Sequence, residues 1–361
     1  MPRLRPLQPL SIALLFIALC AHLAPAAAQK ASKTKAVNTV RGGASYAARE
    51  DAMQFADEIA RRRNLDPAWV RATIGSARML GNVPRLMLPA PGGTRKNWAV
   101  YRSRFIDPVR IAAGQRFWRD NADTLARAER DFGVPPEIVV GIIGVETIYG
   151  RNMGSFRVLD ALATLSFDFP DAHPRAEQRR AFFREELESF LSTESRTHED
   201  PTRPLGSYAG AMGMPQFMPS SIAKYAVDYD GDGRIDLVNN PTDVIGSVAN
   251  YFKSFGWQRG MAATYPVRLA PDARMPLLLE KDILPSFSAD SFVAAGAQLD
   301  AAGTRHPGLL ALIELQNGAD APAQYVAGTQ NFYVITRYNW SSYYAMSVLD
   351  LGNEVKAAMA Q

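Results

Sequence analysis

The sequence predicts an α+β protein that is mostly α-helical, with a small antiparallel β domain in its C-terminal third. Three observations support this fold class. Apolar residues recur at helical spacing through most of residues 46–260. From residue 261 the pattern changes to short segments rich in β-branched and aromatic residues, which are separated by Pro, Gly, Asn and Asp. A single cysteine rules out a disulfide framework, so stability must come from packing or bound metal.

The composition is that of a folded globular chain, with 47% hydrophobic and 21% charged residues. A length of 361 residues allows two or three domains. The formal net charge is +4, and two of the positive charges lie in the first 28 residues, which leaves +2 for the rest. This weak positive charge suits an anionic polymer or a membrane surface. Nucleic acid is not an expected partner, because the chain has no long Lys/Arg run and no zinc-ligand spacing.

Residues 1–28 are typical of a secretory signal peptide. Arg3 and Arg5 precede an apolar run over residues 11–20, and three alanines at 26–28 form the expected cleavage site. Cys20 follows a leucine and not a small residue, so we expect cleavage after Ala28 and no lipid anchor. The polar, small and basic residues 29–43 that follow predict a disordered lead-in.

The remaining chain divides into four expected parts. Residues 44–132 predict an α domain, which begins with two helices joined by a short loop around Asp66. Residues 133–260 predict a mainly helical core with glycine-rich loops and a long amphipathic helix over residues 174–192. Residues 261–335 predict the β domain, and residues 336–361 a C-terminal segment that returns to the core as a helix. The expected strand segments are 264–270, 291–296, 309–316, 323–328 and 331–338.

A carboxylate, Glu146, interrupts an otherwise apolar helical segment. The segment starts with two prolines and an acid, which suit a helix N-terminus, and Gly150 is its expected end. The residues between leave no polar face, which is typical of a buried helix. Desolvation and the helix C-terminus would both raise the pKa of a carboxyl group at this position, which suits a general acid. The alternative is a structural Glu, hydrogen-bonded in the core or paired with Arg151.

Residues 228–243 contain an acidic loop with the spacing of an EF-hand. The aspartates at its first, third and fifth positions are Asp228, Asp230 and Asp232. Arg234, at the seventh position, offers its backbone carbonyl group. The twelfth residue is Asn and not Glu, and Asp243 is the acid available to close a longer loop. Because three such aspartates repel one another without a cation, we expect structural Ca²⁺ in this loop. We expect no organic cofactor. The alternative is an acidic surface turn without metal.

Four stretches together resemble the lytic murein transglycosylase B family, a group similar to glycoside hydrolase family 103. They are GVETIYGRNMG, GSYAGAMGMPQFMPSSIAKYAVDYDGDG, DVIGSVANYF and NFYVITRYNWSSYYAMSVLDLG. The resemblance covers about residues 45–358, in the order expected of the family. It implies that residues 133–260 form a lysozyme-like core, accompanied by an α domain, a small β domain and an EF-hand-like calcium loop.

The resemblance implies an enzyme that cleaves the β-1,4 bond between N-acetylmuramic acid and N-acetylglucosamine in peptidoglycan and forms a 1,6-anhydro sugar. Glu146 matches the family's single catalytic acid, which protonates the glycosidic oxygen and then takes the proton of the C6 hydroxyl group. No second carboxylate is needed, unlike in the usual glycosidase scheme. The expected partners are glycan strands and other cell-wall enzymes, and we expect a periplasmic monomer; an outer-membrane lipoprotein is the less favoured location.

The resemblance also implies a set of sugar-binding residues: Tyr101, Ser207, Gln216, Tyr251, Tyr338, Asn339 and Tyr344. Core packing is the alternative for the tyrosines. Three features depart from the family pattern. The stretch from Asp228 to Asp243 is one residue longer, Trp340 stands where the family has an arginine, and Cys20 lacks the context for lipidation.

Two other functions remain open at this point. A hydrolase such as a muramidase or chitinase, on the same scaffold, would need a second carboxylate across the groove, for which Asp168 and Asp171 are candidates. A non-catalytic scaffold that binds peptidoglycan would have no need of a costly buried acid at Glu146.

Overall fold

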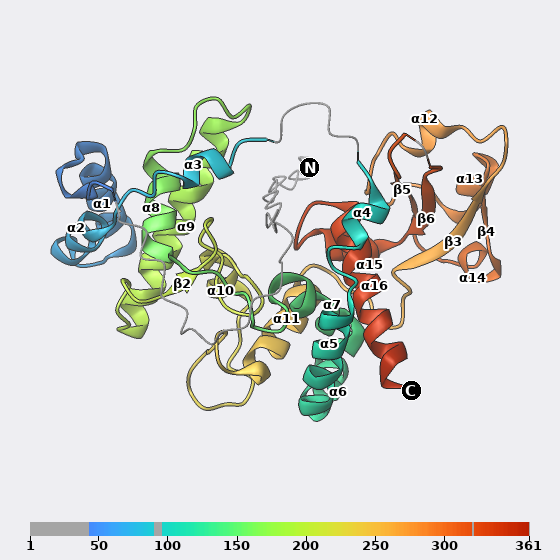
Figure 1. Ribbon diagram of the computed structural model, residues 1–361, viewed down its shortest axis with the longest axis horizontal. Coiled ribbons are helices and arrows are strands. Elements are labelled where there is room, and N and C mark those ends of the chain that lie inside the picture. The colour runs from blue at the N-terminus through green and yellow to red at the C-terminus, as the bar shows by residue number, and fades with distance from the viewer. Residues whose placement is uncertain (1–42, 90–95, 320, 361) are drawn as a thin grey trace, which may run out of the picture. The chain divides into compact units, whose positions relative to one another are not determined.

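The computed structural model describes residues 43–89, 96–319 and 321–360, which form two compact units (Figure 1). The described part of the larger unit comprises residues 43–254 and 347–360, and the smaller unit comprises residues 255–346. The expected signal peptide and all but the last residue of the expected lead-in lie outside the described residues. In the described ranges no helix combines the length and the apolar character that a membrane span requires.

Helices make up most of the larger unit. Its first part contains η1 Tyr46–Ala48, α1 Glu50–Arg63, α2 Pro67–Ser76, α3 Val83–Leu86, α4 Trp98–Arg102, α5 Pro108–Asp120 and α6 Ala122–Phe132. Its second part contains α7 Pro136–Thr147, α8 Val158–Phe167, α9 Ala176–Thr197, α10 Pro219–Tyr225, α11 Pro241–Ser254 and most of α16 Ser342–Met359. Two short strands, β1 Phe156–Arg157 and β2 Leu205–Gly206, pair antiparallel. The expected α domain and core share this one unit, so their division at residue 132 stays a prediction.

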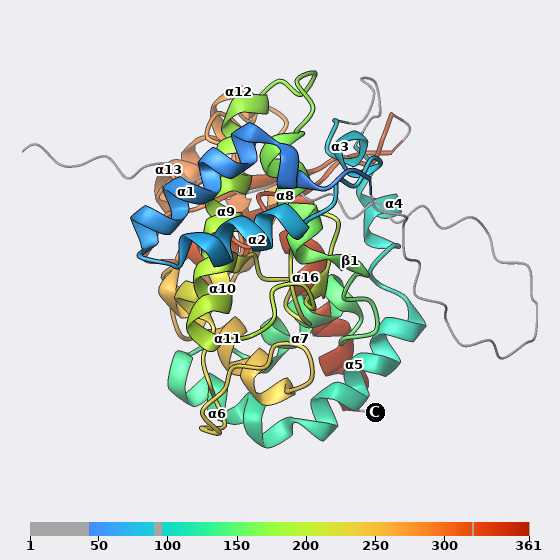
Figure 2. The same cartoon turned by 90° about the vertical axis from the view of Figure 1, so that its left-hand side faces the viewer.

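The first two helices confirm the pair predicted around Asp66. The Asp66 side chain accepts a hydrogen bond from the Ala68 N–H group and so caps the start of α2. Asn64 ends α1 in the left-handed conformation. Figures 1 and 2 show α1 and α2 alongside α8 and α9, and Arg62 of α1 forms an ion pair with the buried Glu188 of α9. These contacts attach the N-terminal helices to the rest of the unit.

The long helix predicted at 174–192 is α9, which continues five residues further, to Thr197. Its apolar face is buried through Phe183, Leu187, Phe190 and Leu191. The added turn contains Glu194, which is only 7% exposed and whose Oε2 atom has no hydrogen-bond partner. Burial, together with repulsion from Glu199 and Asp200, raises the pKa of Glu194 to about 7. α9 therefore ends with a carboxyl group that the fold disfavours in its charged form.

The variant Glu194→Gln is expected to stabilise the protein at alkaline pH. The pKa of Glu194 is higher in the folded protein than its ordinary value of 4.5. Below pH 4.5 the carboxyl group is protonated in both the folded and the unfolded state, so its burial costs no charge. As the pH rises through 7 the folded state has to bury a charged carboxylate, and this stability is lost. Gln does not ionise, so the variant should exceed wild type by about 1–3 kcal/mol at pH 8 and match it near pH 4.5. Urea unfolding at both pH values measures this difference.

Glu185→Gln is the matched control, because Glu185 lies on the same helix but is exposed. An identical pH dependence of the free energy of unfolding in the two variants would contradict the assignment to Glu194.

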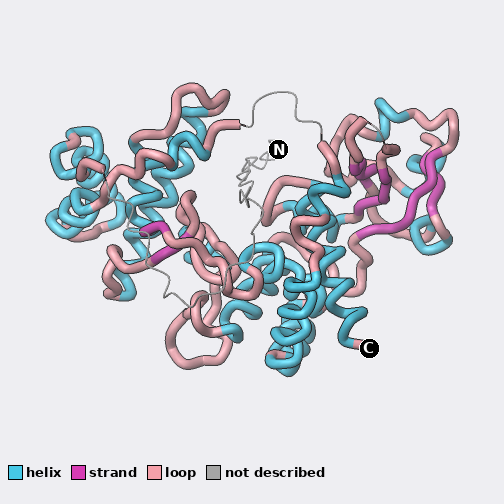
Figure 3. Tube along the Cα trace, viewed as in Figure 1, coloured by secondary structure: helices cyan, strands magenta, loops and turns pink. Residues whose placement is uncertain are grey.

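A four-stranded antiparallel sheet organises the smaller unit (Figure 3). Its strands are β3 Thr264–Leu269, β4 Ala297–Leu299, β5 Ala311–Leu315 and β6 Gln324–Gly328, in the order β4-β3-β6-β5. Four helices accompany them: α12 Met275–Leu278, α13 Ala289–Ala294, α14 Ala301–Thr304 and α15 Gln330–Thr336. Phe292, Leu310 and Leu312 belong to the buried core between these elements. The sheet confirms the prediction of a small antiparallel β structure.

Two segments predicted as strands are helices. Residues 291–296 lie mostly in α13, and residues 331–338 lie mostly in α15. Each helix is capped at its start, by Ser288 accepting from the Ser291 N–H group and by Thr329 accepting from the Asn331 N–H group. β-branched and aromatic residues favoured strands in both segments. Phe292 of α13 and Phe332, Val334 and Ile335 of α15 are buried by tertiary packing, which overrides the local preference, whereas Val293 of α13 is exposed.

Candidate active site

Glu146 is the second-last residue of α7 and is half-buried. Residues 138–145 before it are all buried, which confirms the predicted apolar helix. Gly141 and Gly144 allow α16 to pack closely on one side: a Cβ atom at residue 141 would lie 2.3 Å from the Val348 carbonyl oxygen. The core therefore holds α7 rigidly, and Glu146 lies at the end where the helix leaves the core.

α7 ends at Thr147 and not at the predicted Gly150. The chain turns on two non-glycine residues, Ile148 and Tyr149, whose φ angles are 53° and 56°. The Thr147 hydroxyl group anchors this turn, because it donates a hydrogen bond to the Met214 carbonyl oxygen (2.8 Å) and accepts one from the Gly150 N–H group (3.0 Å). The residue next to Glu146 is thereby tied to the loop around residue 214.

Gln216 lies in that same loop and holds the segment that follows α7. Its side-chain nitrogen donates hydrogen bonds to the carbonyl oxygens of Met153 (3.2 Å) and Gly213 (2.9 Å). With both amide protons used, the amide oxygen is the group of Gln216 that can still accept a bond. Gln216 therefore lies in the loop that Thr147, the residue after Glu146, contacts through the Met214 carbonyl oxygen.

Ser207 is buried and organises its own turn. Its Oγ atom accepts hydrogen bonds from the N–H groups of Ala209 (3.3 Å) and Ala211 (3.0 Å). The preceding residue, Gly206, is approached so closely by Gly154 that a Cβ atom at residue 154 would lie 2.1 Å from the Gly206 carbonyl oxygen. Ser207 thus has a clear structural role, and its contact with sugar stays a prediction.

The two predicted tyrosines of the larger unit differ in their surroundings. Tyr251 is 3% exposed and packs edge-on against Tyr225, at 5.1 Å between ring centroids. Tyr101 is half-exposed and stacks on Trp98 at 6.3 Å. The packing alternative therefore fits the ring of Tyr251 better than that of Tyr101, and sugar contact stays a prediction for both.

Tyr338, Asn339 and Tyr344 belong to the smaller unit. The rings of Tyr338 and Tyr344 stack, with centroids 6.4 Å apart and planes 16° from parallel. The Oδ1 atom of Asn339 is buried without a hydrogen-bond partner, an arrangement that costs free energy unless a ligand or water satisfies it. The Arg337 guanidinium group lies 5.4 Å from the ring centroid of Trp340, so a cation accompanies the tryptophan at the position where the resemblance implies an arginine.

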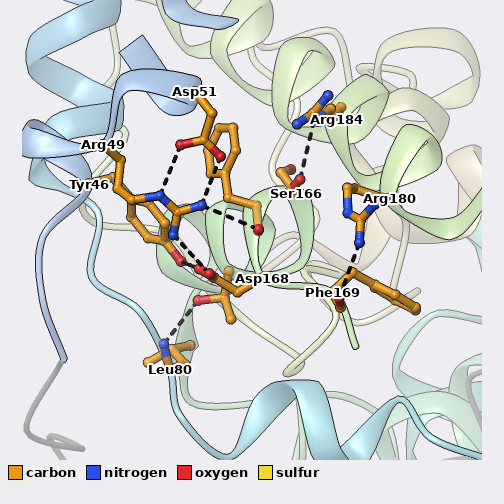
Figure 4. A network of polar contacts seen from close by, with 11 residues as sticks. Tyr46, Arg49, Asp51, Leu80, Ser166, Asp168, Phe169, Arg180 and Arg184 are labelled. Carbon is orange, nitrogen blue, oxygen red and sulfur yellow. Dashed lines mark hydrogen bonds and ion pairs between the residues drawn. The ribbon is translucent and has the colours of Figure 1, made fainter. Parts of the chain in front are cut away.

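Asp168 and Asp171, the candidates for a second carboxylate, have other partners, and Figure 4 shows those of Asp168. Asp168 accepts hydrogen bonds from the Tyr46 hydroxyl group (2.5 Å) and the Arg49 guanidinium group (2.8 Å). These bonds fasten the N-terminal segment to the end of α8. Asp171 is exposed and pairs with Arg180 (2.6 Å). Neither carboxylate has an environment that suits a catalytic base.

The three aspartates of the predicted calcium loop come together. Oxygen atoms of Asp228, Asp230 and Asp232 all lie within 4.8 Å of one another. The Asp228 carboxylate accepts hydrogen bonds from the N–H groups of residues 231, 232 and 233, which bends the loop around it. Asp230 accepts a further bond from the Asn240 amide (2.7 Å). Arg234 is exposed, and its side chain lies 3.5 Å from Glu199. The donor set is all oxygen, as a hard cation requires.

Asp243 lies in the first turn of α11 and is fully buried. Its two carboxylate oxygens accept hydrogen bonds from the N–H groups of Tyr229 and Asp236, each at 2.8 Å. The carboxylate thus joins two separate points of the loop. Tyr229 extends the anchorage to α6, because its hydroxyl group donates to Asp131 (2.7 Å).

The sequence analysis missed two residues that pack against the end of α7, Arg110 of α5 and Tyr149. Arg110 donates a hydrogen bond from Nε to the Gly144 carbonyl oxygen (3.3 Å), which places a cation at the helix C-terminus. Tyr149 fills space that Gly114 and Gly144 leave open. Glycines inside helical segments were the available signal, since they often mark close packing.

Comparison with known proteins identifies relatives along most of the chain. The model of the transglycosylase SLT domain matches residues 47–353. Membrane-bound lytic murein transglycosylase B of Escherichia coli (strain K12) is 40% identical over 334 residues, which span 90% of this chain and 88% of that protein.

Solved structures agree with this similarity. The Escherichia coli lytic transglycosylase Slt35 in complex with bulgecin A superposes with a TM-score of 0.77 at 41% identity, covering 89% of this chain and 97% of that one. The same enzyme has been solved in complex with calcium, with a TM-score of 0.76 at 40% identity and the same coverage of both chains. SltB3 from Pseudomonas aeruginosa, in complex with NAG-anhNAM-pentapeptide, superposes with a TM-score of 0.70 at 27% identity, covering 84% of this chain and 79% of that one.

Proposed function

The chain belongs to the transglycosylase SLT domain family, and we propose that Glu146 is the single catalytic acid and base with which it cleaves peptidoglycan. The protein is an enzyme of the lytic transglycosylase class. One observation supports the role of Glu146 above others. It is the half-buried carboxylate in the last turn of an otherwise buried helix, beside the loop that carries Gln216.

The reaction requires one group that first donates a proton and then removes one. Glu146 gives its proton to the glycosidic oxygen as the bond between that oxygen and C1 of N-acetylmuramic acid breaks. The C6 oxygen of the same sugar then bonds to C1, and the C6 hydroxyl proton passes to Glu146. The carboxyl group is regenerated, no water is consumed, and the product ends in a 1,6-anhydro ring. The NAG-anhNAM-pentapeptide bound by SltB3 has an end of this kind.

We propose that the substrate is the glycan strand and that its sugars contact the residues named by the resemblance. The amide oxygen of Gln216 is an acceptor for sugar hydroxyl or acetamido groups, and aromatic rings suit sugar faces. The full set is Tyr101, Ser207, Gln216 and Tyr251 in the larger unit, and Tyr338, Asn339 and Tyr344 in the smaller. Residues 133–260 would form the lysozyme-like core of the enzyme.

We further propose that the acidic loop holds Ca²⁺ as a structural ion. The converging oxygens of Asp228, Asp230 and Asp232 support this, and Slt35 has been solved in complex with calcium. The Arg234 carbonyl group and Asp243 complete the proposed ligand set. A bound cation would neutralise three close carboxylates and so fix the loop ahead of α11.

The location that fits this substrate is the cell envelope. The segment 1–28 supports export to the periplasm, where a monomer would meet glycan strands and other cell-wall enzymes.

Product analysis tests the reaction itself. Wild-type enzyme incubated with purified peptidoglycan in heavy-oxygen water is expected to release muropeptides with 1,6-anhydro ends and without the heavy isotope. Mass spectrometry separates these from hydrolysis products, which are heavier by one water molecule and carry the label at the reducing end. Labelled reducing ends would show a hydrolase, and glycan binding without any release would show a non-catalytic scaffold.

A further inference from the structure

The turn after Glu146 has a backbone conformation that side chains rarely adopt. Ile148 and Tyr149 are both left-handed, with φ angles of 53° and 56°. Contact between the Cβ atom and the following carbonyl oxygen disfavours this conformation outside glycine, and a β-branched residue such as Ile148 is the least suited to it. Such a turn persists only where the surrounding structure holds it in place.

The ring of Tyr149 occupies a closely fitted slot beside this turn. It packs against Phe117 of α5, with ring centroids 5.2 Å apart. Its hydroxyl end lies in the space left by Gly114 of α5 and Gly144 of α7. A Cβ atom at either glycine would lie only 2.5 Å from the Tyr149 hydroxyl oxygen. The ring is therefore wedged between two helices, next to the last turn of the helix that carries Glu146.

The hydroxyl group of Tyr149 makes no hydrogen bond, although it is buried. Burial raises the pKa of this hydroxyl group, so it stays neutral over the pH range in which enzymes work. The hydroxyl oxygen is enclosed between Gly114 and Gly144, so it has no room for a sugar group beside it. The ring is therefore expected to act through its shape.

We propose that Tyr149 is a positioning residue: its ring, held between Gly114 and Gly144, fixes the last turn of α7 and with it the direction of the Glu146 carboxyl group. This inference rests on the proposed role of Glu146. Two backbone bonds transmit the constraint, since the Tyr149 N–H group donates to the Ile143 carbonyl oxygen (3.3 Å) and the Ile148 N–H group to that of Gly144 (3.2 Å). Without the ring, both residues relax towards ordinary φ values and the last turn re-forms.

Tyr149→Leu and Tyr149→Phe separate the ring from the hydroxyl group. We expect the leucine variant to lower kcat about 100-fold while the glycan KM and Kd change less than about threefold, because a misplaced catalytic group costs rate and not binding. The phenylalanine variant keeps the shape and should restore kcat to within about threefold of wild type. Its Tm should not fall, because the oxygen that it removes has no partner.

Phe183→Leu is the control for a purely structural effect. Phe183 is fully buried in α9 and its loss should lower the Tm without acting on α7. A kcat loss in Tyr149→Leu no larger than in Phe183→Leu, at a similar loss of Tm, would overturn the inference. So would an equal kcat loss in Tyr149→Phe, because the hydroxyl group and not the ring shape would then matter.

Gly114→Ala tests the same slot if Tyr149→Leu does not fold. Its added methyl group would lie 2.5 Å from the Tyr149 hydroxyl oxygen and 2.6 Å from Val355, so kcat should fall. Adding Tyr149→Phe removes the first of these two clashes, so kcat should partly recover. Absence of recovery in the double variant would contradict the close fit of the Tyr149 ring between Gly114 and Gly144.

The proposed function and the inference on Tyr149 fail in different ways. The proposed function fails when wild-type enzyme releases no 1,6-anhydro ends, whereas the inference on Tyr149 is judged by kcat ratios among variants.

Discussion

Glu146→Gln is expected to lower the release of 1,6-anhydro muropeptides by about 10³-fold or more. The amide has nearly the same size and shape, but it neither protonates the glycosidic oxygen nor takes the proton of the C6 hydroxyl group. Both steps are affected because one group serves both. The fold should be retained, because Glu146 lies at the C-terminal end of α7, where a negative charge gains nothing from the helix dipole. Mass spectrometry of released sugars and a thermal melt measure the two effects.

Glu137→Gln is the matched control on the same helix. Glu137 lies in the first turn of α7, is half-buried, and pairs with Lys356 at 2.8 Å, so its loss should cost a little stability and no activity. If Glu146→Gln kept more than about a tenth of wild-type activity, another group would have to supply the proton. Equal losses in both variants would indicate damage to α7 and not the loss of a catalytic acid.

The helix that carries Glu146 could be predicted because it depends on local pattern. Apolar residues at every face, with proline at the start, specify a buried helix in almost any context. Its end could not be predicted. Gly150 satisfied the usual rule for a helix stop, yet the chain turns at Ile148 and Tyr149, whose conformation is set by packing against α5. Contacts between segments that are distant in the sequence leave no local pattern comparable to the apolar residues and prolines that predicted α7.

The same distinction explains the two helices mistaken for strands. The capping residues Ser288 and Thr329 were visible in the sequence, but the β-branched and aromatic residues after them outweighed these signals. In β3, β5 and β6 the same composition did mark strands, because those segments pair with one another. Composition alone does not distinguish a buried helix turn from a strand.

The candidate binding residues show how far a resemblance extends. It named Ser207 and Gln216 as sugar contacts, but not that the Ser207 oxygen and both protons of the Gln216 amide already bond to the backbone. These bonds concern the shape of the loop beside Glu146. Substitutions at either residue would therefore disturb loop geometry as well as sugar contact, and a loss of activity there would have two physical causes.

Asp243→Ala is expected to lower the Tm by about 10 °C even in the presence of a chelator, in line with a loss of about 3–5 kcal/mol. The substitution removes the acceptor of the half-buried N–H groups of Tyr229 and Asp236, leaves a cavity where the fully buried carboxylate was, and removes a negative charge from the first turn of α11. Asp243→Asn retains an acceptor oxygen and should lose less. A Tm for Asp243→Ala equal to that of wild type in chelator would contradict this structural role.

Added Ca²⁺ separates the structural role of Asp243 from its proposed role as a ligand. Wild-type Tm should rise with calcium, by the equivalent of about 2.7 kcal/mol at a hundredfold excess over Kd. Asp228→Asn is the matched control, because Asp228 lies in the cluster of three carboxylates and its variant keeps an oxygen for the loop N–H groups. That variant should lose the calcium response while nearly keeping the Tm in chelator.

The calcium response of Asp243→Asn decides the role of Asp243. If this variant also loses the response, Asp243 is a calcium ligand and also holds the loop through its backbone bonds. If it keeps the response, the backbone bonds are its whole role. A wild-type Tm that ignores calcium would exclude the ion, and the three carboxylates would then be an acidic turn closed by hydrogen bonds alone.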